Sequence, residues 1–138
     1  MPPQYQQALR DADALALQYP GILITGHSLG GGLATYVSAM TGLPAHVFNP
    51  AGLGQGARNQ SAASGTGVHE GQLTTYVIPG EVLTTWSLLI GQPGPSGKIV
   101  ELPYQDNVEA WGPLANHQTE TISQAINQLE RNAQAPRE

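Results

Sequence analysis

The sequence predicts an α/β fold in which a mostly parallel sheet is flanked by helices. Short apolar runs of strand type alternate along the chain with segments of helical periodicity, and glycine or proline separates them. At residues 22–33, which read I-L-I-T-G-H-S-L-G-G-G-L, a strand-type run leads into a small-residue helix without a loop. The 138 residues, of which 40% are apolar, suffice for one core, so we expect residues 1–138 to form a portion of a single domain.

The chain opens with an expected amphipathic helix. Its apolar residues recur at spacings of three and four, which gives the helix one buried face, and Pro20-Gly21 ends it. Residues 22–25 then form an uninterrupted apolar strand, as in a parallel sheet that is covered on both faces. We therefore expect a central strand with a neighbour on each side. The apolar positions of the helix are Tyr5, Ala8, Leu9, Ala12, Ala16 and Tyr19.

A second helix and a second strand should follow. The helix is expected to run to about Thr41, where Gly42 ends it. Residues 45–49 form the next strand, so this part of the chain is a parallel βαβ unit. Residues 52–67 are mostly Gly, Ala, Ser, Asn and Gln, and two interpretations stay open: a lid over the carboxyl edge of the sheet, or a disordered surface loop. The small residues that would let the helix pack closely on the sheet are Gly31, Ala34 and Ser38.

The second half of the chain supplies two further strands and a helix. Residues 73–78 form the third strand, and residues 98–102 form the fourth, at an edge of the sheet. The apolar run at residues 82–90 is expected to be core or a short packed helix. An amphipathic C-terminal helix is marked by Ile122, Ala125, Ile126 and Leu129.

Residues 26–30 read G-H-S-L-G and fit the nucleophile elbow G-x-S-x-G, in which a serine sits on a sharp turn between a strand and a helix. Ser28 should have a strained backbone that lifts its hydroxyl clear of the sheet. Gly26 and Gly30 should approach each other too closely for a Cβ atom, because the helix packs back on the strand. The Leu29 N–H would then face a substrate oxygen as one oxyanion donor. The alternative is a glycine-rich turn whose serine is only a helix cap.

A nucleophilic serine needs a base and an acid that orients the base, which in α/β-hydrolases follow in the order serine, acid, histidine. His27 is part of the elbow and points away from the hydroxyl of its neighbour. No Asp or Glu lies between Ser28 and His69, so neither His46 nor His69 can follow an acid. His117, in a loop ahead of the last helix, remains as the candidate base.

The candidate acid is Glu81, which lies just past the carboxyl end of the third strand, where Pro79-Gly80 would turn it inward. Asp106, in the loop before His117, is the second candidate. Glu70 precedes its strand, and Glu101 falls inside one. The alternative for Glu81 is an exposed carboxylate in a turn.

Composition excludes several classes of function. The net charge is −5 and no basic cluster exists, so we expect no nucleic-acid partner. The absence of cysteine excludes disulfides and thiol catalysis. No apolar run reaches the length of a transmembrane segment, and no signal peptide is visible, which leaves the compartment open. Nothing in the pattern implies a metal or a cofactor.

Residues 22–31 resemble the serine signature of the class 3 lipases, a group of α/β-hydrolases in which G-H-S-L-G-G is typical. Two later segments extend the resemblance: V-F-N-P-A-G at 47–52 and Y-V-I-P-G-E-V-L-T at 76–84. The second is similar to the segment that carries the catalytic acid, normally aspartate, where this chain has Glu81. His117 also fits. The resemblance implies hydrolysis of carboxylic esters, above all of lipids, and similar bacterial domains belong to larger secreted or effector proteins.

The resemblance departs at the front of the chain. The family places several strands and a second oxyanion donor ahead of the helix that precedes the elbow, whereas these residues start at that helix. The resemblance therefore implies the C-terminal portion of the fold, completed by a missing N-terminal part of the domain or by a second polypeptide. Alone, this portion should associate through the free strand edge and catalyse weakly. The second hypothesis is a catalytically incomplete fragment, or a binding module, that keeps the elbow only for packing.

Overall fold

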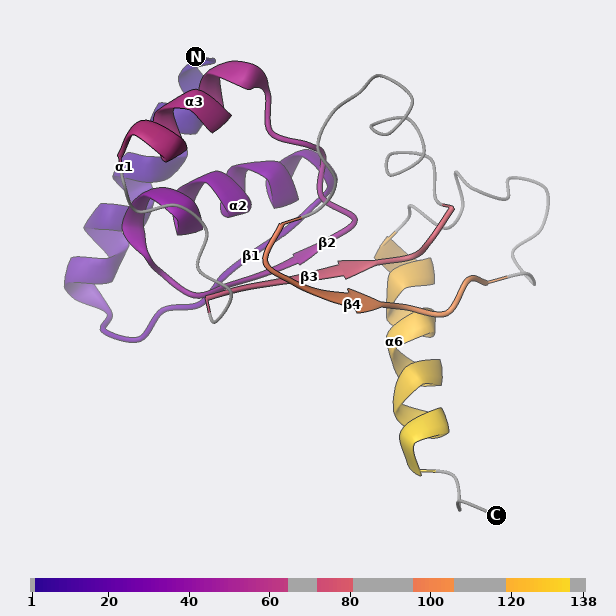
Figure 1. Cartoon of the computed structure of the whole chain (residues 1–138). Coiled ribbons are helices and arrows are strands. Elements are labelled where there is room, and N and C mark those ends of the chain that lie inside the picture. The colour runs from indigo at the N-terminus through magenta and orange to yellow at the C-terminus, as the bar shows by residue number, and fades with distance from the viewer. Residues whose placement is uncertain (1, 65–71, 81–95, 106–118, 135–138) are drawn as a thin grey trace.

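The computed structural model describes residues 2–64, 72–80, 96–105 and 119–134. In these parts the chain forms a four-stranded parallel sheet between helices, so the α/β fold is confirmed (Figure 1). The sheet follows chain order, with β1 (Ile24–His27), β2 (Ala45–Phe48), β3 (Leu73–Val77) and β4 (Lys98–Glu101). The helices are α1 (Pro3–Gln18), α2 (Ser28–Thr41), α3 (Gln55–Ala63) and α6 (Thr119–Gln134).

Helix α2 covers one face of the sheet. Residues of β2 alternate between buried and partly buried, because successive side chains of a strand point to opposite faces. Ala45 and Val47 are fully buried and form one cluster with Leu73 of β3 and Ala34 of α2. Gly42 ends α2 with a φ of 75°, as expected.

Helix α1 packs on the outer side of α2 rather than on the sheet. Its buried residues are Tyr5 and Ala12, which form a second cluster with Tyr36 and Val37 of α2. The rings of Tyr5 and Tyr36 meet edge to face at a centroid distance of 5.2 Å. Tyr19 was expected on the buried face, but it lies beyond the helix and is 59% exposed.

Helix α3 contradicts the expectation of a loop over residues 52–67. Residues 55–63 are helical, and Ala57 is buried in the same cluster as Tyr36. The physical reason is tertiary: the small Ala57 side chain fits against α2, and Arg58 bonds the Leu53 carbonyl within the same segment. Residues 65–67 lie outside the described residues. The interpretation as a lid is therefore limited to the residues that follow α3.

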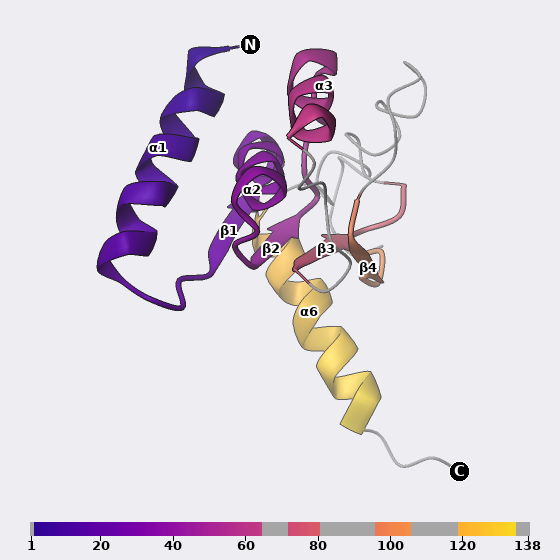
Figure 2. The ribbon, with the colours of Figure 1, turned by 60° about the vertical axis from the view of Figure 1, so that its left-hand side comes forward.

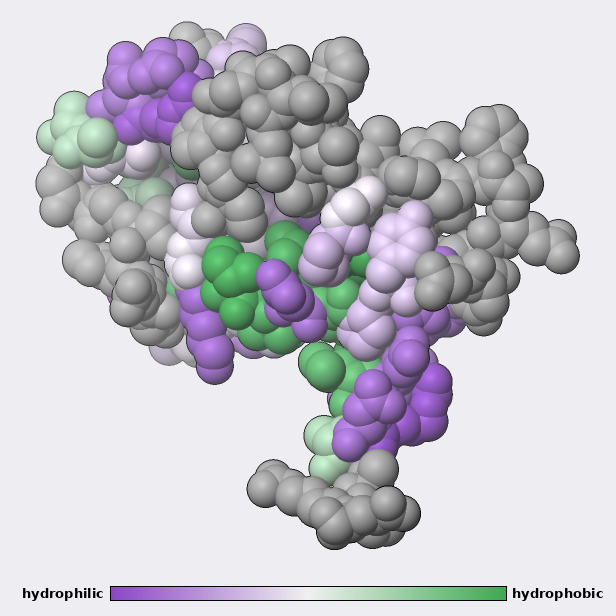
Figure 3. All heavy atoms as spheres, turned by 45° about the vertical axis from the view of Figure 1, so that its right-hand side comes forward, coloured by the Kyte–Doolittle hydropathy of each residue, from purple (hydrophilic) through white to green (hydrophobic). Residues whose placement is uncertain are grey.

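Helix α6 lies across the sheet from α2 (Figures 1 and 2). Ile122 and Ala125 of α6 are buried with Ile78 and Leu102, which follow β3 and β4. Seen as spheres, α6 has a hydrophobic stripe on one side and hydrophilic residues on the other (Figure 3). The expected C-terminal amphipathic helix is therefore confirmed. The apolar run at residues 82–90 lies outside the described residues.

Strand β1 starts and ends two residues later than expected. Its first ladder bond runs from the Ile24 N–H to the Pro44 carbonyl at 2.9 Å, and the strand continues through Gly26 and His27 to reach Ser28. Within the described residues β1 pairs with β2 alone, so one of the two expected neighbours is present there. In the described sheet the opposite side of β1 is an edge, and so is β4, which was expected to be one.

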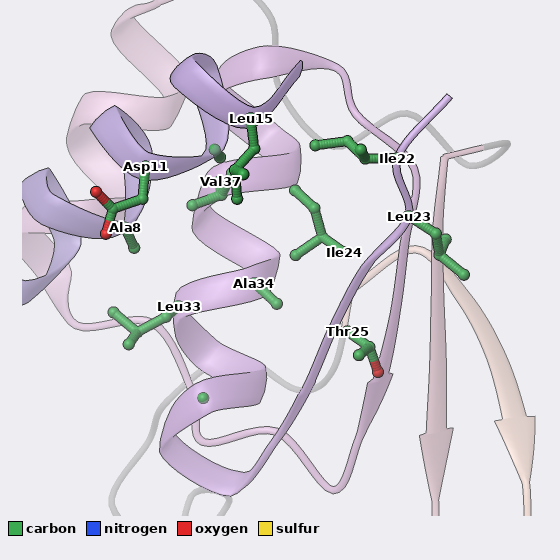
Figure 4. A pocket seen from close by; sticks show the side chains of 12 residues that line it. Ala8, Asp11, Leu15, Ile22, Leu23, Ile24, Thr25, Leu33, Ala34 and Val37 are labelled. Carbon is green, nitrogen blue, oxygen red and sulfur yellow. The ribbon is translucent and has the colours of Figure 1, made fainter. Parts of the chain in front are cut away.

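A hollow of about 410 Å³ opens beside the β1 edge, between α1, α2 and β1 (Figure 4). Ile22 and Ile24 point toward α2, and Leu23, which also lines the hollow, points away from them (Figure 4). Leu33 and Val37 of α2 line the inner wall. The lining is apolar apart from Thr25 and Asp11. The edge of β1 is thus bordered by apolar surface.

Candidate active site

Ser28 adopts the strained backbone that the elbow requires. Its φ is 56°, and Ser28 and Asn49 are the non-glycine residues with positive φ in the part of the chain that the structure describes. This region costs an L-residue on the order of 1–3 kcal/mol, and such strain persists only where surrounding contacts hold it. Ser28 follows the last residue of β1 directly and is the first residue of α2. The strand, the turn and the helix thus meet at a single residue.

Close packing at the elbow requires Gly26 but not Gly30. A Cβ atom on Gly26 would overlap the Gly30 carbonyl and lie 2.7 Å from the Gly31 nitrogen. Gly26 therefore has the expected role. The same role was expected for Gly30, and that expectation is wrong, because no atom lies within 4 Å of the Cβ it lacks. Gly26 approaches the backbone of Gly30. The side of Gly30 where a Cβ atom would lie faces the hollow.

Two further glycines bring α2 against the turn that follows β2. A Cβ on Gly31 would lie 2.9 Å from the Pro50 Cβ, and one on Gly32 would lie 2.8 Å from the Ala51 carbonyl oxygen. The sequence indicated small residues here for packing on the sheet. The structure shows that their closest contact is the turn after β2.

The N-terminus of α2 has no side-chain cap and no acidic residue in its first turn. His27 occupies the N-cap position. The first N–H groups of a helix have no partner within the helix and carry its positive dipole end. Leu29, the candidate oxyanion donor, belongs to this first turn, and its side chain is 52% exposed. This geometry can stabilise negative charge next to Ser28.

The carboxyl ends of β1, β2 and β3 are hydrogen-bonded to one another. The Ala51 N–H donates to the Ser28 carbonyl at 2.8 Å, which ties the elbow to the turn after β2. The Asn49 N–H donates to the Tyr76 carbonyl at 2.8 Å, and the Ile78 N–H donates to the Asn49 Oδ1 at 2.9 Å. These bonds place Ser28 at the same sheet edge as the exit of β3. Sequence reasoning did not single out Asn49.

Three of the four residues expected to act with or beside Ser28 lie outside the described residues, namely Glu81, Asp106 and His117. Their described neighbours are placed. Gly80 ends the turn after β3 with a φ of 80°. Gln105 is buried and donates from Nε2 to Gln128 Oε1 of α6 at 2.7 Å. Thr119 Oγ1, at the start of α6, lies 3.5 Å from His27 Nδ1.

The N-terminus of α6 therefore lies beside the elbow. His27 is the residue directly before Ser28, and its contact with Thr119 joins segments 92 residues apart in the chain.

On the described residues, no group of three or more His, Asp or Glu side chains is arranged to hold a metal ion. The same residues contain no helix long and apolar enough to cross a membrane.

The fold and the site define a class: an α/β protein with a strained serine on a strand-to-helix elbow, at the carboxyl edge of a parallel sheet. A family model described as "Phospholipase-like: Tle-like phospholipase domain" matches residues 1–134. The chain belongs to this family of phospholipase-like domains, which are hydrolases of lipid esters. A comparison with curated proteins found no similar sequence. The expected resemblance to lipid-ester hydrolases is confirmed at the level of this family, which is not specifically that of the class 3 lipases.

Proposed function

We propose that this domain hydrolyses carboxylic esters of lipids through a Ser-His-Glu triad with Ser28 as the nucleophile. The observation that carries the proposal is the left-handed backbone of Ser28 at the uncapped N-terminus of α2. A structural serine cap does not require this strain, whereas an exposed nucleophile at an elbow does. The signature G-H-S-L-G-G adds the finer suggestion of a mechanism like that of class 3 lipases.

His117 is the proposed general base. The support is the contact between His27 and Thr119, because Thr119 follows His117 by two residues. Two residues span at most about 7 Å of extended chain. The segment that contains His117 therefore enters α6 beside the elbow, and this supports His117 as the base.

Glu81 is the proposed acid, in preference to Asp106. Gly80, the residue before Glu81, ends the turn that leaves β3 at the Ser28 edge of the sheet. Gln105, the residue before Asp106, is bonded to Gln128 of α6. Nine residues separate Thr119 from Gln128, and at about 1.5 Å per residue this places Gln128 roughly 13 Å along α6 from its start. Gln105, and not Asp106, is thus the residue placed at a distance from the start of α6, and this supports Glu81 as the acid over Asp106.

The chemistry follows from these positions. Ser28 Oγ attacks the ester carbonyl carbon while His117 accepts the hydroxyl proton, and the Leu29 N–H stabilises the negative charge on the carbonyl oxygen. The tetrahedral intermediate collapses, the protonated His117 gives its proton to the leaving alcohol, and an acyl-serine remains. Water then attacks the acyl-serine with His117 again as base, which releases the fatty acid and restores Ser28. Glu81 orients the imidazole and stabilises its protonated form.

The edge of β1 that has no neighbour among the described residues is proposed to pair with a further strand, from another part of the domain or from a second polypeptide. The Ile24 N–H bonds toward β2. Because successive residues of a strand direct their backbone groups to opposite sides, the N–H and C=O of Thr25 face the open side. Unpaired backbone groups beside the apolar hollow favour association. The added strand would also be the place for a second oxyanion donor.

The test is labelling of the purified chain with a fluorophosphonate probe, together with fatty-acid release from phospholipid vesicles. Wild type should be labelled on Ser28, and Ser28→Ala should abolish both labelling and fatty-acid release. Ser123→Ala, at an exposed position on α6, is the matched control and should keep both. Labelling that persists in Ser28→Ala would reject the nucleophile. A folded wild type that is never labelled, alone or with a completing strand supplied, would favour the binding-module hypothesis.

A further inference from the structure

Asn49 is the second strained residue at the carboxyl edge of the sheet. Its φ is 38°, and its side chain is only 1% exposed. Asparagine tolerates this region better than other non-glycine residues, but most positions with such a backbone carry glycine. Glycine would relieve this strain, so the question is what the buried asparagine side chain supplies that glycine lacks.

The side chain of Asn49 holds the exit of β3. Its Oδ1 accepts the Ile78 N–H at 2.9 Å, one residue beyond the end of β3. Ile78 is fully buried, so losing this acceptor would leave its N–H in the core without that bond. Pro79 follows without an N–H of its own, and Gly80 then turns with positive φ. One side-chain bond thus sets where the chain leaves the sheet toward residue 81.

The other side of the same turn holds the elbow. Two residues after Asn49, the Ala51 N–H donates to the Ser28 carbonyl. Between them, Pro50 packs against Gly31 in the first turns of α2. The turn formed by residues 49–51 is therefore bonded to the strained serine on one side and to the exit of β3 on the other.

We infer that Asn49 is a positioning residue that fixes the exit of β3 relative to Ser28. The inference rests on the proposed function, since it gives Asn49 its effect through Glu81, the first residue after that exit turn. A shift of about 1 Å in the acid or in the base that it orients can lower turnover on the order of a hundredfold. Asn49 does not touch the reacting atoms.

Three variants separate the contributions of Asn49. Asn49→Gly accepts the same backbone conformation and removes the amide, and with it the bond to Ile78 and any other interaction of that side chain. Asn49→Asp retains an Oδ acceptor of the same shape. Asn127→Gly makes the same substitution at an exposed position on α6, where it lowers stability without contact to the turn. Ester turnover, KM, the pH profile and thermal unfolding are measured for each protein.

Asn49→Gly should lower kcat about a hundredfold with KM changed less than about threefold, whereas Asn127→Gly should leave kcat unchanged. Asn49→Asp should retain most of the kcat that Asn49→Gly loses. In Asn49→Gly the acid limb of the kcat/KM profile should move to lower pH, because a displaced carboxylate no longer favours protonated His117. A merely structural role would not move this limb.

A double-mutant cycle with Glu81→Gln decides the inference. If Asn49 acts through Glu81, Asn49→Gly should cost less than about threefold in the Glu81→Gln background. Full additivity, or wild-type kcat in Asn49→Gly, overturns the inference. If Asn49→Gly does not fold, Asn49→Ser takes its place, and failure of both while Asn49→Asp folds assigns a purely structural role and also overturns it. Activity that survives in Ser28→Ala defeats the proposed function instead, so the two failures are distinguishable.

Discussion

The carboxyl end of the sheet and its β1 side edge are built in opposite ways. At the carboxyl end, backbone and side-chain hydrogen bonds join the ends of three strands, and two strained residues are held among them. At the β1 edge, strand pairing stops within the described residues and an apolar hollow lies open. Among the described residues, the strained non-glycine residues thus lie at the end that carries Ser28, and the strand edge without a neighbour lies at the side. The first feature supports the proposed catalytic role of Ser28, and the second supports the proposed pairing with a further strand.

The largest effect should come from Ser28, the proposed nucleophile. Ser28→Ala keeps the Cβ atom and the backbone strain and removes only the hydroxyl. We expect ester hydrolysis to fall on the order of a million-fold where chemistry limits the rate. The thermal midpoint should stay at the wild-type value. Activity above about a tenth of wild type, measured with the same vesicles, would show that another nucleophile acts.

The next largest effect should distinguish Gly26 from Gly30, the two glycines of the elbow motif. Gly26→Ala places a methyl group against the Gly30 carbonyl, so we expect a loss of about 3 kcal/mol or more of unfolding free energy, at or beyond the upper end for overpacking. Gly30→Ala has open space and lies in a helix, where alanine is favoured by up to about 1 kcal/mol. Denaturant unfolding of both variants measures the difference. Equal losses would contradict the one-sided contact.

The sequence predicts the alternation of strands and helices well because the relevant signals are local. Apolar runs, Gly42 and the elbow spacing specify β1, α2 and β2 within a few residues of their positions. Residues 55–63 could not be predicted as a helix from composition, because their order depends on Ala57 packing against Tyr36. The role of Asn49 depends on Ile78, which is 29 residues away in the chain. Local patterns do not encode such partners.

Association through the β1 edge can be tested by introducing a charged residue there. We expect the isolated chain to associate or aggregate through β1, and Leu23→Lys to weaken association roughly tenfold, because a lysine at a strand edge opposes pairing. Leu23 directly precedes β1, where a further strand would approach the edge, and it is 55% exposed, so the lysine can reach water. The matched control is Leu17→Lys on α1, where the leucine is 87% exposed and does not line the hollow. Sedimentation velocity over a concentration series gives the result.

Two outcomes at this edge would count against the proposal. Equal effects of the two lysine substitutions would indicate general hydrophobic association rather than strand pairing. A stable wild-type monomer with the full turnover of a lipase would show that no completing strand is needed. The proposal instead predicts weak catalysis by the isolated chain, since lacking one oxyanion donor would cost about 2.7–4 kcal/mol of transition-state stabilisation. Adding a polypeptide that supplies the strand should raise turnover.

The smallest expected effect is a change in the free energy of unfolding, from a substitution in the core between α1 and α2. Tyr36 is fully buried in α2, and its hydroxyl has no hydrogen-bond partner among the described residues. Tyr36→Phe keeps the ring contact with Tyr5 and removes an unpaired polar group, so we expect the free energy of unfolding to rise by up to about 1 kcal/mol. Denaturant unfolding at neutral pH measures this gain.

The pH dependence of Tyr36→Phe sharpens the test. Burial raises the pKa of the Tyr36 hydroxyl above its ordinary value. Because the unfolded state then ionises first, wild type should lose stability as the pH rises above about 10, the pKa of an exposed tyrosine. The variant lacks this group, so its advantage over wild type should widen above that pH, while Tyr5, whose pKa burial also raises, contributes equally to both proteins. A variant that is less stable than wild type at neutral pH would mean that the hydroxyl is bonded in solution, and that the core between α1 and α2 is as fully satisfied as the carboxyl edge of the sheet.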